Sequence, residues 1–362
     1  MREKKGQPDR MLFYITLLLL TIGLIMVLSS SSYQAMLENK DAYYFFKRQF
    51  IFAGLGLAAM FIMMYIRPEL IERLAFPTIV VVVIMLLLVP FIGVEVKGAR
   101  RWLGTQNMRF SPAEIAKPVT IICFAIWLRT LGKNLQTMKG FAVSMVFLAI
   151  MPLLIFGQDL GTAIVVAGTL FCMMIIAQAR WLHLVGLGFI GLAGIVGAII
   201  IEPYRMNRIT GFLHPFENAT GAGWQLVQSL YALGSGWLFG VGLGDSRQKL
   251  LYLPERHTDF IFAIIGEELG FVGATLVVVL FALFIWRGFW IAMRIEDELK
   301  SYIAFGLTCC VGIQALVNLG VVVGVLPVTG ITLPFISYGG SSLSIMLASV
   351  GYLLNMSRYV KK

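Results

Sequence analysis

The sequence has few charged residues. Asp, Glu, Lys and Arg together make up 13% of its 362 residues, whereas 59% are hydrophobic. A soluble domain needs much more polar surface than this, so the composition excludes that class. The apolar residues come in runs of about 18 to 25, which is the length that crosses a bilayer. We therefore expect a polytopic membrane protein.

Cysteine is also scarce, and its placement argues against two kinds of site. Cys123, Cys172, Cys309 and Cys310 all fall inside apolar runs. Their spacing fits neither a disulfide framework nor a zinc site. We interpret them as small buried hydrophobic residues, and we expect no redox chemistry.

A nucleotide-binding motif is missing too. The stretch from Gly240 to Lys249, Gly-Val-Gly-Leu-Gly-Asp-Ser-Arg-Gln-Lys, superficially resembles a glycine-rich loop. It lacks the Gly-Lys-Ser/Thr ending of a P-loop, and it does not follow the strand that a dinucleotide fingerprint requires. We find no internal repeat and no low-complexity tract, and we expect no nucleic-acid partner.

The apolar runs predict an all-α fold. Backbone groups in hydrocarbon must be satisfied within their own segment, so each run should form a helix. The first run is interpreted as a retained helix rather than a signal peptide, because it is longer than a signal-peptide core and no clear cleavage site follows it. We predict one integral membrane domain, residues 1–362, with about ten transmembrane helices near 11–30, 49–66, 74–93, 113–131, 140–157, 160–178, 181–202, 260–286, 301–324 and 335–356.

One large loop, residues 203–259, is predicted to lie outside the membrane. It is rich in glycine and aromatic residues, so we expect short helices and turns at the outer interface. Two adjacent carboxylates, Glu267 and Glu268, would be costly in lipid. We therefore predict that residues 259–268 form a short helix against the bundle and that the eighth span begins near Leu269. Within the seventh span, a stripe of small residues predicts a close helix contact; its members are Gly188, Gly191, Gly194 and Gly197.

The basic residues predict the orientation of the chain. Counting Lys and Arg in the connecting segments favours cytoplasmic N- and C-termini. Many cations nevertheless fall on the predicted outer side, against the insertion bias, which indicates an anionic ligand at that surface. Ordinary contacts with lipid headgroups are the alternative. These outer cations are Lys40, Lys47, Arg48, Lys97, Arg100, Arg101, Arg109, Lys117, Arg205, Arg208, Arg247, Lys249 and Arg256.

Ionisable residues at the membrane boundary are the candidate site. Asp259 lies where the polar loop meets an apolar run, a place where the pKa of a side chain can be tuned to move a proton. Alternatively, Asp259 caps a helix N-terminus, where the helix dipole would lower its pKa. Glu114 and Lys117 are three residues apart on one helix face, so they are expected to pair, either for structure or for function.

Four motifs carry a resemblance to a known family. The chain resembles the SEDS family (shape, elongation, division and sporulation), bacterial cell-wall polymerases that include RodA, FtsW and SpoVE. The resemblance covers essentially the whole chain and is greater to the FtsW and SpoVE branch. The motifs are Lys97-Gly-Ala-Arg-Arg-Trp102-Leu-Gly with Phe110-Ser-Pro-Ala-Glu114-Ile-Ala-Lys117-Pro, Gln158-Asp159-Leu-Gly-Thr, the stretch from Gln225 to Glu268, and Asn318 with Pro327-Val-Thr-Gly-Ile-Thr-Leu-Pro334-Phe-Ile-Ser337-Tyr-Gly-Gly-Ser-Ser342.

The resemblance implies a peptidoglycan glycosyltransferase on the outer face of the bacterial cytoplasmic membrane. Such an enzyme joins lipid II units into glycan strands and works with a class B penicillin-binding protein. Asp259 matches the essential aspartate of the family, and we expect it to act as the general base while undecaprenyl pyrophosphate departs with inversion. The residues expected to contact substrate or line its cavity are Arg101, Trp102, Glu114, Lys117, Arg205, Arg208 and Lys249.

Two alternatives and one cofactor stay open at this point. Ten helices with ionisable residues also suit a lipid II flippase, and a non-enzymatic division scaffold would not need Asp259. The cations and Asp259 gather at the outer end of the predicted bundle, which favours chemistry over transport. A divalent cation, Mg²⁺ or Mn²⁺, bridging Asp259 and pyrophosphate is conceivable, although no metal motif supports it.

Overall fold

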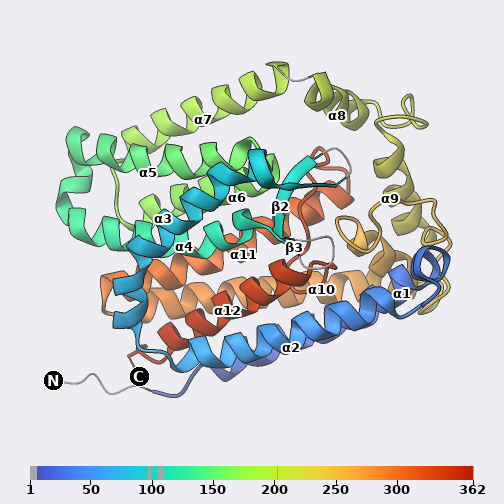
Figure 1. Ribbon diagram of the computed structural model, residues 1–362, viewed down its shortest axis with the longest axis horizontal. Coiled ribbons are helices and arrows are strands. Elements are labelled where there is room, and N and C mark those ends of the chain that lie inside the picture. The colour runs from blue at the N-terminus through green and yellow to red at the C-terminus, as the bar shows by residue number, and fades with distance from the viewer. Residues whose placement is uncertain (1–5, 97–98, 105–108, 202, 362) are drawn as a thin grey trace.

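The protein is a helical bundle with two distinct ends (Figure 1). The structure, a computed structural model, describes residues 6–96, 99–104, 109–201 and 203–361. The first and last of these lie at one end, which we call the termini end; the loop end, opposite, carries the strands, two short helices and long loops. The helices are α1 (Arg10–Asn39), α2 (Tyr44–Tyr65), α3 (Pro68–Ile92), α4 (Pro112–Leu131), the 3₁₀ helix η1 (Gly132–Gln136), α5 (Met138–Phe156), α6 (Leu160–Ile176), α7 (Trp181–Ile201), α8 (Pro203–Leu213), α9 (Trp224–Ser235), α10 (Ile261–Arg294), α11 (Glu298–Val322) and α12 (Gly340–Ser357).

The all-α prediction is confirmed, and the number of spans stays a prediction. Within the described ranges, seven helices are long and apolar enough to cross a membrane: α1, α2, α3, α4 with η1, α5, α10 and α11. Two further apolar helices, α6 and the first part of α7, are shorter. The loop 203–259 contains the two short helices α8 and α9 separated by turns, as predicted.

A small sheet between α3 and α4 was not predicted. It has three antiparallel strands in the order β1 (Val94–Val96), β2 (Ala99–Gly104) and β3 (Arg109–Phe110). Val94 lies opposite Trp102, and Leu103 lies opposite Phe110. Strands this short give only a few alternating residues, too few for a periodicity argument. The sheet carries Arg101 and Trp102 at the loop end.

Glycine allows α2 and α12 to pack closely. A Cβ atom added at Gly351 of α12 would clash with the backbone of Met60 in α2, and one at Gly56 of α2 would meet the side chain of Leu347 and the backbone of Ser344. Small residues let helix backbones approach in a membrane protein, where van der Waals packing drives association. This pair is one of the close contacts that organise the bundle.

The glycine stripe of α7 was predicted to make a close helix contact, and the described part of the structure does not show one. A Cβ atom added at Gly188, Gly191, Gly194 or Gly197 would have no neighbour within 4 Å. Helix α7 lies along one edge of the bundle and packs against α6 and α8 (Figure 1). The expected close contact of this stripe is therefore not made with any described residue.

Helix α10 is broken near its start, as predicted. Gly270 has φ 69° and ψ −169°, so a short helix over 261–269 precedes the long span. The break frees backbone groups, and the segment 237–242 pairs with them. Phe271 N donates to Trp237 O at 2.7 Å, and Val241 N donates to Glu267 O at 3.0 Å. Buried backbone groups must find partners, so this pairing is what permits the break.

The connection between α11 and α12 enters the bundle without forming a helix. The tenth span was predicted to begin near 335, but α12 begins at Gly340, and Leu333, Phe335 and Ile336 are buried in extended or turn conformations. Pro334 disfavours helix in the residue before it. Irregular backbone at membrane depth is tolerated only where protein groups satisfy it. We refer to residues 328–339 as the inserted segment.

Candidate functional site

Asp259 lies in the turn that leads into α10, beside the inserted segment. A Cβ atom added at Gly330, whose φ is +77°, would lie 3.7 Å from Asp259 Oδ2, so the carboxylate faces this glycine. Helix α10 begins at Ile261, and its cap residue Phe260 makes no side-chain hydrogen bond to the helix. The structure therefore does not show Asp259 as the cap of α10, and the capping alternative loses its support.

The surroundings of Asp259 raise its pKa to about 7. Burial is the largest cause, because removal from water disfavours the charged form, and the nearby carboxylates Glu255 and Asp159 raise the pKa further. Arg101 and Arg208 act in the opposite direction. A carboxyl group with this pKa is partly ionised and partly protonated at neutral pH, which suits an acceptor of protons.

Arg101 and Asp159 face each other at the loop end. Arg101 Nη1 of β2 lies 3.9 Å from Asp159 Oδ2. Asp159 precedes α6 and caps it, accepting from Thr162 N at 3.3 Å and from Thr162 Oγ1 at 3.0 Å. Burial raises the pKa of Asp159, whereas Arg101 and the bonds from Thr162 lower it. The sequence motif containing Asp159 therefore contributes a second carboxylate close to the first.

The turn that carries Asp159 is anchored to α3. Gln158 Nε2 donates to Leu86 O at 2.6 Å. Pro90 lies four residues after Leu86 and has no N–H, so the Leu86 carbonyl has no helical partner of its own. The Gln158 amide supplies the missing donor. This contact fixes the start of α6, and hence Asp159, relative to the helix that leads into the small sheet.

Arg208 reaches the same region from α8. Its Nη1 donates to Val328 O at 3.0 Å, at the start of the inserted segment. The side chain of Arg205, one turn earlier on α8, lies outside the described residues. Trp102 is half-buried in β2 next to Arg101, opposite Val94. The structure thus brings Asp259, Asp159, Arg101 and Arg208 into one group, which we call the loop-end cluster.

Glu114 and Lys117 form the pair that the sequence predicted, and further contacts extend it. Lys117 Nζ lies 2.8 Å from Glu114 Oε2 and donates to Gln314 Oε1, also at 2.8 Å. Ser342 Oγ donates to Glu114 Oε2 at 2.8 Å. Lys117 is buried. The four side chains connect α4, α11 and the start of α12.

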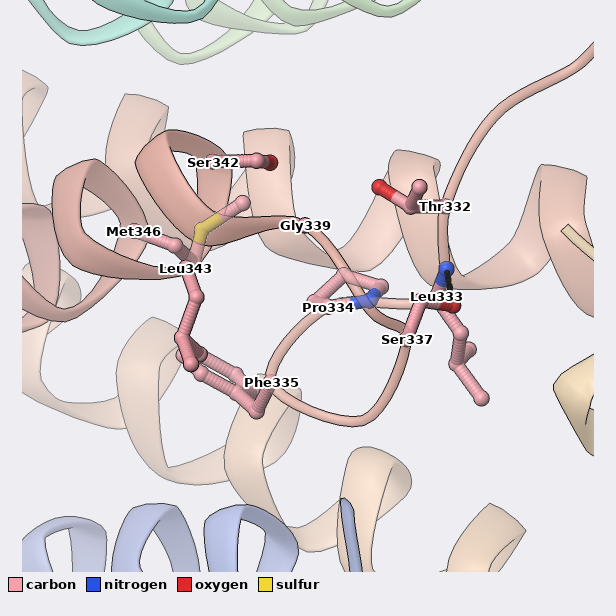
Figure 2. Close-up of a pocket in the computed structure, with 9 residues that line it drawn as sticks. All are labelled: Thr332, Leu333, Pro334, Phe335, Ser337, Gly339, Ser342, Leu343 and Met346. Atoms are coloured by element: carbon pink, nitrogen blue, oxygen red, sulfur yellow. Dashed lines mark hydrogen bonds between the residues drawn. The ribbon is translucent and has the colours of Figure 1, made fainter. Parts of the chain in front are cut away.

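Two small pockets adjoin this network. One is lined in part by Glu114, Lys117 and Cys310. Figure 2 shows the other, which lies between the inserted segment and the first turn of α12, with the hydroxyl groups of Thr332 and Ser342 on one side and the Phe335 ring on another. Met346 lines both pockets. The Glu114–Lys117 pair therefore borders a small pocket, and its contact with substrate stays a prediction.

Lys249 belongs to a separate polar group. It is buried, and its Nζ lies 3.3 Å from Glu268 Oε1. Ser29 Oγ of α1 donates to the same carboxylate at 2.6 Å. The neighbouring Glu267 accepts from Ser246 Oγ and, at 2.9 Å, from Arg247 N. The positive charge of Lys249 is thus paired with Glu268, and Lys249 is not one of the residues of the loop-end cluster.

Comparison with known proteins decides the family. The model of the cell cycle proteins FtsW, RodA and SpoVE matches residues 9–362. The chain belongs to the FtsW/RodA/SpoVE family. It is 47% identical to the stage V sporulation protein E of Bacillus subtilis, with 99% of both chains covered. It is 39% identical to the probable peptidoglycan glycosyltransferase FtsW of Geobacter sp. strain M18, covering 99% of this chain and 98% of that protein.

Solved structures agree with this assignment. One, from a study of how a peptidoglycan synthase complex coordinates polymerization and crosslinking, superposes with a TM-score of 0.81 at 29% identity, covering 97% of this chain and 98% of that one. The rod shape determining protein RodA of Thermus thermophilus gives a TM-score of 0.71 at 27% identity, with 98% of both chains covered. The predicted affinity with the FtsW and SpoVE branch is confirmed by the higher identities to those proteins. This family member is a multi-pass protein of the cytoplasmic membrane.

Sequence reasoning left several residues of the site without a role. Asp159, Asn318 and Ser337 fall inside motifs that were singled out, yet no role was derived for them. Asn318 Nδ2 donates to Asp259 O, and Ser337 Oγ donates to Thr258 O. Only the fold places these side chains against the turn before α10, so spacing along the chain gave no signal for the contacts.

Proposed function

We propose that this chain polymerises lipid II into glycan strands on the outer face of the cytoplasmic membrane. Its broader class, peptidoglycan glycosyltransferase, follows from membership of the family, whose FtsW members bear that name. The observation that carries the mechanism is the loop-end cluster, in which a partly buried carboxyl group with a raised pKa lies among fixed positive charges.

The proposed reaction is an inverting displacement. A sugar 4-hydroxyl of the acceptor attacks the anomeric carbon of the donor, the new glycosidic bond forms, and the bond to undecaprenyl pyrophosphate breaks. Asp259 accepts the hydroxyl proton, and the leaving group carries away the bonding electrons. One general base suffices for inversion when the leaving group is already a stable anion. A pKa near 7 keeps part of the Asp259 population ionised and ready to accept a proton at neutral pH.

The leaving pyrophosphate needs positive charge, and the loop-end cluster supplies it. Arg101 and Arg208 act on Asp259 from two different elements, β2 and α8. Planar guanidinium groups bind phosphate oxygens in pairs, which favours these two residues as pyrophosphate contacts. Arg205 is proposed for the same role from its position on α8. Lys249 is a weaker candidate because it pairs with Glu268.

Glu114, Lys117 and Trp102 are proposed to shape the substrate cavity. The Glu114–Lys117 pair lines a pocket and is held by Gln314 and Ser342, so the four side chains would present a fixed polar surface to the substrate. Trp102 is positioned by the sheet next to Arg101, where its ring braces the strand or contacts a sugar. All three residues lie on the elements that surround the loop-end cluster.

A divalent cation fits the cluster only in part. Among the described residues, no three His, Cys, Asp or Glu side chains lie together as a ready metal site. Mg²⁺ is commonly held by one or two carboxylates with phosphate oxygens and waters, and Asp259 with Asp159 offers two carboxylates. These residues would hold Mg²⁺ or Mn²⁺, which would supply further positive charge at the pyrophosphate.

The remaining parts of the proposal concern partner and orientation. We propose that residues 1–362 form one membrane domain, with both termini in the cytoplasm and the loop end outside, and that the partner is a class B penicillin-binding protein. Similarity to a chain from a peptidoglycan synthase complex supports such a partner. The alternative, a lipid II flippase, would need polar groups along a crossing route, whereas the loop-end cluster gathers at one end.

The test is polymerisation of purified lipid II by detergent-solubilised protein, with and without the penicillin-binding partner. Asp259→Asn should lower the rate by about a hundredfold to ten-thousandfold, because the general base is lost. Asp245→Asn is the matched control, since Asp245 is an exposed carboxylate of the same loop. Full activity of a folded Asp259→Asn protein, or no polymer from the unmodified protein, would overturn the proposal.

A further inference from the structure

Asn318 ties the backbone of Asp259 to the inserted segment. It lies inside α11 and is 1% exposed. Its Nδ2 atom donates to two carbonyl oxygens from different parts of the chain, Asp259 O at 2.7 Å and Ile331 O at 2.7 Å. Both N–H bonds of the amide are therefore used in joining the turn before α10 to the strand-like part of the inserted segment.

A second side chain reinforces this connection. Ser337 Oγ donates to Thr258 O at 2.6 Å and accepts from Leu333 N at 2.8 Å. Tyr338 N adds a bond to His257 O at 2.8 Å. The carbonyl oxygens of residues 257–259 thus each accept a hydrogen bond from α11 or from the inserted segment, and the backbone that carries the Asp259 carboxylate is fixed from one side.

We propose that Asn318 is a positioning residue for proton transfer, holding the Asp259 carboxylate in its place between Arg101, Arg208 and Gly330. The inference rests on the proposed function, because it assigns to Asn318 a part in the reaction of Asp259. Asn318 acts through the backbone and does not touch the substrate. Its loss leaves one buried and one partly buried carbonyl group without this donor, so the turn shifts until they find water or another partner.

A small shift of this turn has two measurable effects. Reacting groups must meet within narrow limits, so a displacement of about 1 Å lowers the rate by about a hundredfold. The shift also admits water to the carboxylate. Burial is the main reason for its high pKa, with Glu255 and Asp159 raising it and Arg101 and Arg208 lowering it. Hydration should therefore move the pKa down towards its ordinary value.

The chain contains a close structural match that serves as control. Asn355 in α12 is fully buried, and its Nδ2 also donates to two backbone carbonyls, Met63 O at 2.9 Å and Ile66 O at 2.7 Å. In both residues the Oδ1 atom is buried without a hydrogen-bond partner among the described residues. Asn355, near the end of α12, thus contacts the end of α2, and both of these hydrogen bonds go there rather than to the turn that carries Asp259.

The experiment compares Asn318→Ala with Asn355→Ala in the lipid II polymerisation assay, with Asp259→Asn measured in parallel. Both alanine variants should lose thermal stability by similar amounts. Asn318→Ala alone should lower kcat by about a hundredfold with KM little changed. Its acidic limb in the pH–rate profile should move to lower pH by about one unit. Asn355→Ala should keep the kcat and the pH profile of the unmodified protein.

The outcomes separate the two proposals. If Asp259→Asn is inactive and Asn318→Ala behaves like Asn355→Ala, the positioning role is wrong and the proposed function stands. If Asp259→Asn is fully active, the proposed function itself fails. Should the alanine variant not fold, Asn318→Ser and Asn355→Ser, each keeping one donor, are compared in the same way. Failure of every Asn318 variant to fold, with folded Asn355 variants, would assign Asn318 a purely structural role and overturn the inference.

Discussion

At Asp259, the property that suits proton transfer, a raised pKa, lowers the stability of the folded protein at neutral pH. Its pKa of about 7 in the folded protein lies well above the ordinary value of 3.8. A carboxyl group of this kind binds its proton more tightly in the folded state than in the unfolded state. Stability therefore falls as the pH rises from the unfolded pKa to the folded one, and the loss is complete above pH 7. The protein keeps an ionisable group where a neutral one would be more stable.

Replacing Asp259 by asparagine should consequently stabilise the protein, and more so at high pH. At pH 5 the folded protein holds Asp259 largely protonated, whereas at pH 8 it must hold the charge in a partly buried site. We expect the rise in Tm of Asp259→Asn over the unmodified protein to be larger at pH 8 than at pH 5, measured by thermal unfolding in detergent. The exposed Asp245→Asn should show no such difference. An equal or smaller gain at pH 8 would contradict the assigned pKa.

At this scale the sequence predicted which groups carry charge but not how they are held. Asp259, Arg101 and the Glu114–Lys117 pair were identified from their place at a membrane boundary and from helical spacing. Lys249, like Arg101, was predicted as a cation on the outer side, yet in the structure it pairs with Glu268. Asn318 is a neutral residue in an apolar helix, and its importance depends on two carbonyls that lie 59 and 13 residues away in the chain.

At the scale of elements, the free-energy cost of charges in lipid predicted one feature correctly, whereas the run of apolar residues predicted another wrongly. The short helix before the α10 break was predicted because placing two adjacent carboxylates, Glu267 and Glu268, in lipid costs free energy. Both side chains are instead buried and paired with protein groups. The last part of the inserted segment, from residue 335 on, was predicted as the start of the tenth span, since its residues are apolar. Its true conformation depends on donors from α11 and α2, including Gln314 to Thr332 O and Gln49 to Ser337 O, which no local pattern reveals.

Glycines that are packed against another helix and glycines that are not should respond differently to substitution by alanine. Gly351→Ala should destabilise the protein by about 1 to 3 kcal/mol, because its new methyl group meets the backbone of Met60. Gly188→Ala should be neutral or stabilise by up to about 1 kcal/mol, because alanine favours helix and no described residue opposes it. Thermal unfolding of both variants in detergent checks this. Equal effects of the two substitutions would show that α2 and α12 are not packed as described.

At the scale of the whole molecule, charge and backbone irregularity gather at the loop end. The small sheet, α8, the turn before α10 and the inserted segment meet there, and each contributes to the loop-end cluster. At the termini end, Gly6 N donates to Arg358 O at 2.8 Å and joins the two chain ends, and Asp9 forms an ion pair with Arg287 of α10 at 2.7 Å. Chemistry on a substrate outside the cell requires the loop end to be extracellular.

Cysteine labelling tests this orientation. For Asp245→Cys the substituted position is exposed in the loop 236–260, and for Lys133→Cys it is exposed in η1 at the opposite end. A membrane-impermeant maleimide should label Asp245→Cys in intact cells and Lys133→Cys only after permeabilisation. Three of the four native cysteines are buried, which keeps the background low. The reverse pattern would place the loop end in the cytoplasm and remove the basis of the proposed reaction.

The pairing of the segment 237–242 with the break in α10 constrains this stretch in an unusual way. The hydrogen bonds run through main-chain atoms, whereas the side chains of Trp237 and Phe239 point outward and are 83% and 79% exposed. Gly240, with φ +80°, and Gly270 are the positions where a side chain would collide with the opposite backbone. Length and glycine placement therefore carry the structural information here. We expect most substitutions in this stretch to leave the register intact, whereas inserting or deleting one residue between Leu238 and Val241 would put the bonds of Trp237 and Leu238 out of register with those of Val241 and Gly242.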